Sequence, residues 1–453
     1  MGTRIKRLTL VVSFLASFVL IQHSVNATSI TGTAARNEKK LETVEGKQKS
    51  IKNIKQESAN TVSIEPENKY KLSTKGGVKI TSEDGSFSAE VGGQILTDFA
   101  WYDEDKSDLG DGTKYRTSRL FLQGTLFKDW HYKGEYDFAD ENVKAKDVWI
   151  SYTGFSPLYI KAGHYKPPFS LEQLTSIRFI TFLERGFLDN FVPGRLMGVS
   201  AGTTGENWSA TLGAFGSSAG GDATQEGDEN WSAIGRVTYA PIHESTRSLH
   251  FGLSGRYMSA QEEPVRYRAK PSSNVTDVRF VDTNPITDVD TTVSLNAELA
   301  TVYGPLSLQS QYVQVSVYRD GQNSDPDFSS WYIYGSYFLT GESRNYSVKT
   351  GAFDRITPKN NFNINNGGIG AWELVTRFDT IDLNDQDIFG GEEENITLGL
   401  NWYINPYVRM MMNYVWVNGD EFATGNIANL HSSETSAGSD DPNIFQIRVQ
   451  ADF

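Results

Sequence analysis

The sequence predicts an all-β protein built as a sixteen-stranded antiparallel transmembrane β-barrel. Three observations support this fold class. From about residue 86 onward, segments of about ten residues alternate apolar and polar side chains, which is the period of a strand with one apolar face. The connections between these segments alternate between tight and long. The last segment ends on Phe453 and has an apolar residue at every second position before it.

The composition suits a barrel better than a soluble protein of the same length. Aromatic residues make up 12% of the 453 residues, yet the mean hydropathy is −0.42. Both values follow if half of each strand faces lipid and half faces water. There are no cysteines, which excludes a disulfide framework, a thiolate metal site and a lipid-modified N-terminal cysteine. The formal net charge of −14 argues against nucleic acid as a partner.

Two segments precede the barrel. Residues 1–27 have the pattern of a signal peptide, with three basic residues, an apolar run of 14 residues from Leu8 to Ile21, and small residues up to Ala27. The apolar run is shorter than the ~20 residues that a membrane-spanning helix needs. Residues 28–70 are polar and fit either a disordered periplasmic linker or a short helix or coiled coil. We assign residues 71–453 to the outer-membrane barrel.

The alternating pattern defines the strands. In one segment, Ile396, Leu398 and Leu400 alternate with Thr397 and Gly399. The expected strands are 87–102, 115–127, 130–139, 147–154, 157–164, 197–204, 207–216, 230–240, 248–259, 291–303, 305–318, 329–340, 369–381, 393–404, 406–418 and 443–453. An even number of strands closes an antiparallel barrel with both ends on the same side.

The connections sort into two classes. Tight turns are expected at Lys128-Asp129, Gly154 to Pro157, Gly205-Glu206, Gly304-Pro305 and Asn405-Pro406. Long loops are expected at 103–114, 165–195, 217–229, 260–290, 319–328, 382–392 and 419–442. Short periplasmic turns and long extracellular loops are typical of outer-membrane barrels. Residues 341–368 are interpreted as one long periplasmic turn, because a further strand there would move Asn405-Pro406 to the long-loop side.

The final strand is the sharpest local signal. Phe445, Ile447, Val449, Ala451 and Phe453 share one face, and polar residues occupy the other. Such a strand with a terminal Phe resembles the signal that outer-membrane assembly machinery recognises, so this machinery is an expected partner together with outer-membrane lipid. Export and barrel pattern together predict the outer membrane of a Gram-negative cell.

Several motifs resemble the phosphate-selective porin O/P family from about residue 71 to the C-terminus. They are Thr74-Lys75-Gly76-Gly77, Phe127-Lys128-Asp129-Trp130, Tyr152-Thr153-Gly154-Phe155-Ser156-Pro157, Leu183-Glu184-Arg185, Leu339-Thr340-Gly341-Glu342, Gly370-Ala371-Trp372-Glu373-Leu374 and Leu400-Asn401-Trp402-Tyr403. The resemblance implies a homotrimer of barrels with loops and a periplasmic turn folded into each pore. It also implies passive diffusion of small anions, phosphate or polyphosphate, past basic residues.

The same resemblance marks candidate pore-lining residues. Arg178 stands where the family has a constriction lysine on the third loop. Arg266, Arg268 and Lys270 match a basic series on the fifth loop, and their spacing of two directs them to one side of an extended segment. Guanidinium groups suit this role because their planar fork matches phosphate oxygens.

Two family positions lack the expected charge. Gln94 replaces a basic residue of the first strand, and Arg116-Thr117 replaces a pair of arginines in the second. Arg116 is retained as a candidate anion-binding residue. Strand parity places Arg119 on the opposite face from Arg116, so Arg119 is not expected to compensate.

Two other classes of function stay open. A weakly selective general porin lacks the anion preference, and a structural or adhesive barrel passes no solute. An enzyme is not expected, because the sequence has no Gly-x-Ser-x-Gly or His-Glu-x-x-His motif and no paired catalytic site among its His residues. No cofactor and no metal are expected.

Overall fold

The computed structural model describes residues 69–453 except 140–141, 219–228, 262, 322–323 and 424–438. The signal peptide at 1–27 and nearly all of segment 28–70 lie outside the described residues. One compact unit begins at Asn68 and contains the barrel. In the described part, no helix combines the length and the apolar character required to cross a membrane.

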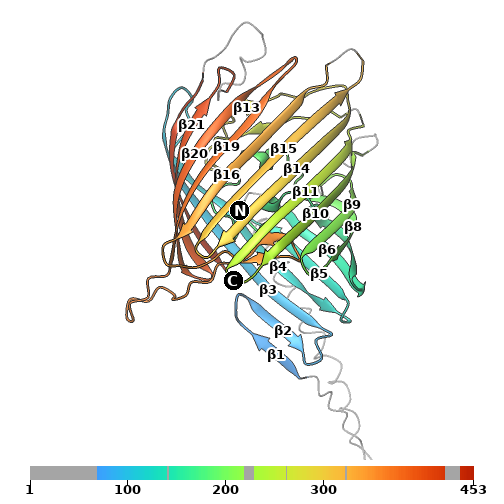
Figure 1. Cartoon of the computed structure of the whole chain (residues 1–453), viewed down its shortest axis with the longest axis vertical. Helices are drawn as coiled ribbons and strands as arrows, with labels where there is room; N and C mark the ends of the chain where they lie inside the picture. Colours follow the sequence, from blue (N-terminus) through green and yellow to red (C-terminus); the bar gives the residue numbers. More distant parts are fainter. Residues whose placement is uncertain (1–68, 140–141, 219–228, 262, 322–323, 424–438) are drawn as a thin grey trace, which may run out of the picture. The chain divides into compact units, whose positions relative to one another are not determined.

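The barrel confirms the predicted strands. One sheet of eighteen strands contains a hairpin, β1 (Tyr70–Ser73) and β2 (Val78–Ser82), and sixteen strands that close the barrel. The sixteen are β3 (Ser88–Asp103), β4 (Gly112–Leu126), β5 (Trp130–Asp137), β6 (Lys144–Phe155), β7 (Leu158–Tyr165), β8 (Leu196–Thr204), β9 (Trp208–Phe215), β10 (Trp231–His243), β11 (Arg247–Ser259), β14 (Val289–Tyr303), β15 (Leu306–Arg319), β16 (Asp327–Phe338), β19 (Ala371–Asp385), β20 (Ile388–Asn405), β21 (Val408–Gly419) and β22 (Asn443–Asp452). Antiparallel pairing of β22 with β3 closes the ring (Figure 1).

The two faces of β22 follow the predicted alternation. Val449 and Phe453 are 45% and 47% exposed on the outer surface, whereas Arg448 is fully buried inside the barrel. The outer face can remain apolar because it meets lipid, and the inner face carries hydrogen-bonding side chains because it meets loops or water.

The hairpin β1–β2 extends the wall beyond the end of β22. Phe453 exchanges backbone hydrogen bonds with Gly93 of β3, and Val78 of β2 pairs with Val91 of β3 immediately beyond them. Gly77 approaches β3 so closely that a Cβ atom there would lie 2.7 Å from the Val91 carbonyl oxygen. The assigned barrel region, 71–453, therefore includes a hairpin that lies outside the closed ring.

One predicted long loop is wrong. Residues 382–392 were expected to form a loop, but β19 and β20 continue to Asp385 and Ile388 and leave a turn at Gln386 and Asp387. The acidic residues of this segment suggested a loop because the apolar alternation stops there. The backbone ladder continues, since a strand above the lipid has water on its outer face and needs no apolar residues there.

Three segments fold into the barrel. The third loop, residues 166–195, contains the short helices α3 (Leu171–Leu174) and η2 (Phe187–Asn190). The fifth loop, residues 260–288, contains β12 (Arg268–Ala269) and β13 (Val281–Asp282). The periplasmic turn between β16 and β19 carries the hairpin β17 (Tyr346–Ser347) and β18 (Ala352–Phe353), whose Phe353 is buried against Leu171 of the third loop.

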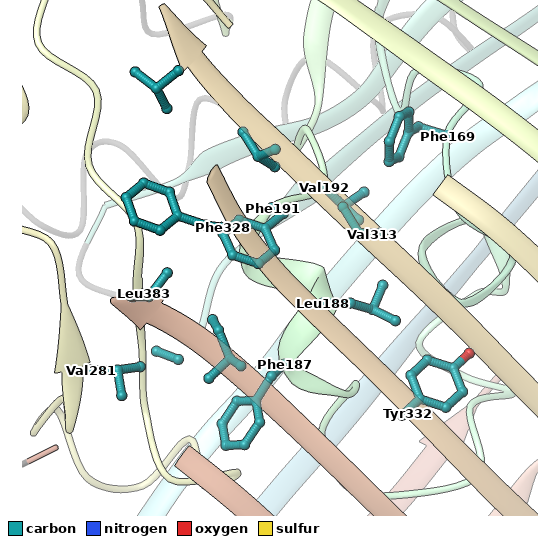
Figure 2. Close-up of a cluster of buried hydrophobic side chains, with 14 of the residues drawn as sticks. Phe169, Phe187, Leu188, Phe191, Val192, Val281, Val313, Phe328, Tyr332 and Leu383 are labelled. Carbon is teal, nitrogen blue, oxygen red and sulfur yellow. The ribbon is translucent and has the colours of Figure 1, made fainter. Parts of the chain in front are cut away.

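The third loop covers only one side of the barrel interior. Figure 2 shows its residues Phe169, Phe187, Leu188, Phe191 and Val192 in one cluster with Val281, Val313, Phe328, Tyr332 and Leu383. These partners come from the fifth loop and from β15, β16 and β19. The apolar contact fixes the loop against this wall, so that free space remains along the opposite wall.

Candidate functional site

The open part of the lumen follows the strands that the third loop leaves uncovered. On the inner face of β8 and β9, the small side chains of Ser200, Ser209 and Thr211 line the open space. The ring of Phe215 covers Gly198 and Gly213 on the same face. A cavity of about 800 Å³ lies on the outer surface of β8–β15, but its apolar lining assigns it to the lipid side. Inside the barrel, a cavity of about 580 Å³ is lined by residues of β2–β10, the third loop and the inward hairpin.

Basic side chains dominate the walls of this cavity. They are Lys79, Lys161, Lys166, Arg236 and Lys349, and the one carboxylate of the lining, Glu90, is ion-paired with Lys79 at 3.7 Å. An ion-paired carboxylate attracts a passing cation weakly, because its field is largely cancelled by its partner. The same pairing cancels Lys79, and Arg236 is bound by Glu298. The basic lining residues without a described carboxylate within ion-pair distance are therefore Lys161, Lys166 and Lys349.

Lys161 is held in the lumen by two aromatic rings. Its Nζ atom lies 4.2 Å from the ring centres of both Trp149 and Tyr165. None of the described carboxylates lies within 4.0 Å of it, and the nearby Asp147 is already bound by Lys133 and Arg195 at 3.0 and 2.8 Å. The rings stabilise the ammonium group through their quadrupoles without neutralising its charge.

Lys166 is a second lumen cation without a carboxylate partner in the described structure. It begins the third loop, and its Nζ atom donates a hydrogen bond to the carbonyl oxygen of Gln173. That bond fixes the side-chain nitrogen beside the cavity. Burial and the neighbouring charges of Arg185 and Arg195 lower the pKa of Lys166, so its positive charge is less firmly held than that of an exposed lysine. Lys161 and Lys166 thus form a pair of fixed donors beside the open wall.

A β-bulge corrects the predicted orientation of Arg119. The register between β3 and β4 shifts between Leu96, which pairs with Thr117, and Thr97, which pairs with Tyr115, so that Arg116 is the extra residue of β4. The bulge reverses strand parity beyond that point. Both arginines therefore point inward, and Arg119 forms an ion pair with Asp137 at 2.8 Å.

Arg116 and Lys270 meet in a second cavity, of about 200 Å³. Its charged lining residues are Arg116, Glu184, Arg185, Asp189, Lys270 and Arg279. Arg116 donates two hydrogen bonds to Glu184, at 2.7 and 2.9 Å, and Lys270 donates to Asp277 and to the Thr276 carbonyl oxygen, each at 2.7 Å. Two predicted residues from distant parts of the sequence thus share one polar chamber.

The other fifth-loop arginines keep the predicted alternation. Arg266 and Arg268 are exposed, whereas the alternate residues Tyr267 and Ala269 pack into the hydrophobic cluster of the third loop. Arg266 is bound by Asp282 through two hydrogen bonds, which cancel much of its field. The same loop supplies a basic residue that was missed, Arg279, whose pKa is lowered by burial and by the neighbouring charge of Arg268.

Arg178 lies near the periplasmic turn rather than beside the other candidates. Its Nη1 atom is 3.6 Å from Asp452, and its guanidinium lies over the ring of Phe179 at 5.1 Å. It shares a small pocket with Arg355 and Tyr407. The third-loop position is as predicted, but the structure brings Arg178 together with the end of β22 and not with Lys270.

The two uncharged family positions form one neutral contact. The side-chain amide of Gln94 donates a hydrogen bond of 2.8 Å to the Thr117 hydroxyl, and both residues are buried. Arg119 is the cross-strand neighbour of Gln94, but it is bound by Asp137.

Sequence reasoning missed Lys161, although a signal was present. Leu158, Ile160 and Ala162 alternate with Tyr159, Lys161 and Gly163, so the outward apolar face of this strand already places Lys161 inside. Lys166 could not be found in this way, because it follows the last strand residue and its direction depends on the packing of the third loop.

The comparisons with known proteins agree with this geometry. The family model described as phosphate-selective porin O and P matches residues 89–453. The chain is 26% identical to Porin O of Pseudomonas aeruginosa over 421 residues, covering 84% of this chain and 92% of that protein. It is 32% identical to an uncharacterized protein of Caulobacter vibrioides over 360 residues, covering 76% and 71% of the two chains.

A solved structure shares the fold alone. OmpT, an outer membrane protein of Vibrio cholerae, is similar with a TM-score of 0.50 at 11% identity, covering 81% of this chain and 98% of that one. The closed sixteen-stranded barrel, its polar lumen and the family match over most of the chain lead to one conclusion. The chain belongs to the phosphate-selective porin O and P family and is a porin of the Gram-negative outer membrane.

Proposed function

We propose that this porin mediates the passive diffusion of small anions, with phosphate or polyphosphate among them, and that it works as a homotrimer. The observation that carries the proposal is the charge of the two interior cavities. The larger one is lined by five basic residues and one carboxylate, and the smaller one by four basic residues and two carboxylates. A pore's preference depends on such lining charges rather than on the sum over its loops.

The proposed path passes the free ammonium groups first. Lys161 and Lys166 have no described carboxylate within ion-pair distance, so their fields act on the solute. Arg116 and Arg266 are bound by Glu184 and Asp282 and contribute hydrogen-bond donors more than net charge. Donors replace part of the hydration shell of the anion, and moderate binding allows release at the next site. No covalent chemistry is required.

Arg178, Arg268 and Lys270 retain their predicted roles as part of this proposal. Lys270 shares the smaller cavity with Arg116, and Arg178 lies near the periplasmic exit. We expect these residues to contribute to the preference for anions together with Lys161 and Lys166.

Reversal potentials of bilayer-reconstituted channels in gradients of potassium chloride and potassium phosphate test the proposal. We expect the sign of the reversal potential to show that anions permeate better than potassium. Lys161→Glu with Lys166→Glu should abolish or invert this preference. Lys69→Glu with Lys71→Glu is the matched control, because it makes the same charge change on exposed residues at the start of the hairpin.

Two outcomes favour the other functions. A reversal potential near zero in the unaltered protein identifies a weakly selective general porin. A barrel that is folded and inserted but passes no current identifies a structural role. The homotrimer is tested separately by the mass of the detergent-solubilised native protein.

A further inference from the structure

The long periplasmic turn between β16 and β19 has a second part that points away from the lumen. Residues 357–370 follow the inward hairpin and leave the lower end of the barrel to one side, as the orange-brown loop in Figure 1 shows. Its apolar side chains are exposed: Ile364 by 84% and Ile369 by 57%. Ile364 is more exposed than any other large apolar residue of the described chain.

The tip that carries Ile364 is ordered by its own hydrogen bonds. Asn363 and Gly368 exchange backbone hydrogen bonds of 2.9 and 3.1 Å, and the Asn363 side chain accepts a bond from the backbone of Asn365 at 2.9 Å. Phe362 donates its backbone N–H to the Ile404 carbonyl oxygen of β20 at 2.8 Å. The fold thus holds an apolar side chain outward on a closed turn.

Two tryptophans attach this turn to the outer wall. The rings of Trp372 and Trp402 are stacked with centres 5.3 Å apart, and the edge of Phe362 packs against Trp402 at 5.2 Å. Both indole N–H groups donate to the carbonyl oxygen of Ile369, at 3.1 and 2.9 Å. Both tryptophans lie at the periplasmic ends of their strands, where aromatic residues mark the level of the lipid headgroups.

The segment also lacks charge. Residues 360–372 contain no Asp, Glu, Lys or Arg, whereas the extracellular loop 103–111 has an acidic residue at five of its nine positions. Asparagine and glycine occupy most of the tip, and these residues can hydrogen-bond to headgroups without the cost of burying a charge. The apolar surface continues directly into Leu374 and Leu398 on the lipid-facing wall.

We propose that residues 360–369 insert into the headgroup and acyl boundary of the phospholipid leaflet that faces the periplasm. Continuity with the lipid-facing wall, the absence of charge and the exposed Ile364 support phospholipid as the occupant. The inward hairpin β17–β18 and this outward segment belong to one connection, so the membrane holds one end of the element whose other end borders the lumen.

Site-directed spin labelling tests the proposal cleanly, because the chain has no cysteine of its own. Ile364→Cys carries a nitroxide label in channels reconstituted in bilayers of phosphatidylethanolamine and phosphatidylglycerol. The collision rate of the nitroxide with molecular oxygen, which concentrates in lipid, is compared with its collision rate with a water-soluble nickel chelate. Leu398→Cys on the lipid-facing wall and Glu83→Cys on the exposed β2–β3 turn are the matched controls.

The proposal expects the oxygen-to-nickel ratio at position 364 to lie several-fold above that at position 83 and close to that at position 398. A ratio equal to that at position 83 places the tip in water and overturns the proposal. Low accessibility to both reagents indicates cover by protein, such as a second copy of the chain, and overturns it as well. Each labelled variant must conduct like the unaltered porin, which shows that the barrel has folded.

Discussion

The guanidinium of Arg236 on β10 is bound to the carboxylate of Glu298 on β14 through two hydrogen bonds, at 3.0 and 2.6 Å. Arg236 also donates to the carbonyl oxygens of Thr350 and Gly351, at 3.3 and 2.7 Å, and these belong to the inward hairpin. One residue of the wall thus binds the inward hairpin through two of its backbone carbonyl groups.

We expect Arg236→Ala to release this hairpin and to increase single-channel conductance, because Thr350 and Lys349 border the larger cavity. Removing one partner of a buried ion pair costs about 3–5 kcal/mol locally, which exceeds what one apolar contact returns. Arg236→Lys keeps a charge and one donor and should have a smaller effect. Unchanged conductance and noise in the alanine variant would show that the hairpin is held by other contacts.

The two rings around Lys161 make a separate prediction. Trp149→Leu leaves the lysine in place but removes one of the rings that position its ammonium group. A cation–π contact contributes about 0.5–2 kcal/mol, so we expect the anion-to-cation permeability ratio to fall by a few-fold. The measurement is the reversal potential in potassium chloride. Trp331→Leu, on the outer surface, serves as control, and an equal decrease there would point to a general effect of losing a tryptophan.

Arg178 can be tested through its partner as well as directly. Asp452 is bound by both Arg178 and Arg355, so Asp452→Asn frees two positive charges near the periplasmic exit. If anions pass this point, Asp452→Asn raises the anion-to-cation permeability ratio and Arg178→Glu lowers it. Opposite shifts in the two variants support a role in permeation. If Arg178→Glu leaves the ratio unchanged, Arg178 does not belong to the constriction.

Glu184 gives the third loop a dependence on pH. Burial disfavours its ionised form, but the guanidinium groups of Arg116 and Arg448 outweigh burial and lower the pKa of Glu184 to about 2. Because this pKa is depressed, the ion pairs of Glu184 with Arg116 and Arg448 stabilise the third loop fully above about pH 4.5. We call these pairs the Glu184 anchor, and their stabilisation is lost as the pH falls towards about 2. The shift corresponds to a stabilisation on the order of 3 kcal/mol.

Single-channel recordings between pH 7 and pH 2.5 measure this anchor. Open-channel noise should remain constant down to about pH 4.5 and increase below it, as the third loop loosens. Glu184→Gln should raise the noise already at neutral pH and flatten its change with pH. Noise that rises equally in both proteins would assign the change to other carboxylates.

The sequence predicts the strands well and the interior poorly, for a physical reason. Lipid demands an apolar residue at every second position of each strand, so the pattern around Ile396 or Val449 is visible without a structure. Nothing comparable constrains the extracellular ends, and the paired strands at 382–392 were mistaken for a loop. The β-bulge beside Arg116 shifts parity by one residue, which no count of alternating positions reveals.

The candidate pore residues show the same division. Tyr159 and Lys161 could be placed inside by strand parity alone. The partners of Arg116 and Lys270 could not, because Glu184 and Asp277 come from loops whose path depends on packing across the barrel. Family resemblance located the basic positions, and only the structure shows which of them are already neutralised.

The attachment of the third loop to one wall makes the water-filled conduit eccentric, so that its bore is set by the opposite wall. On β8 and β9 a Cβ atom at Gly202 would lie 2.4 Å from the Tyr159 hydroxyl oxygen, and one at Gly213 would lie 2.7 Å from Ser200 Cβ. Side chains at these glycines would displace their neighbours into the conduit. Two glycines that the solute does not touch therefore keep Tyr159 and Ser200 back against this wall and preserve the width of the conduit.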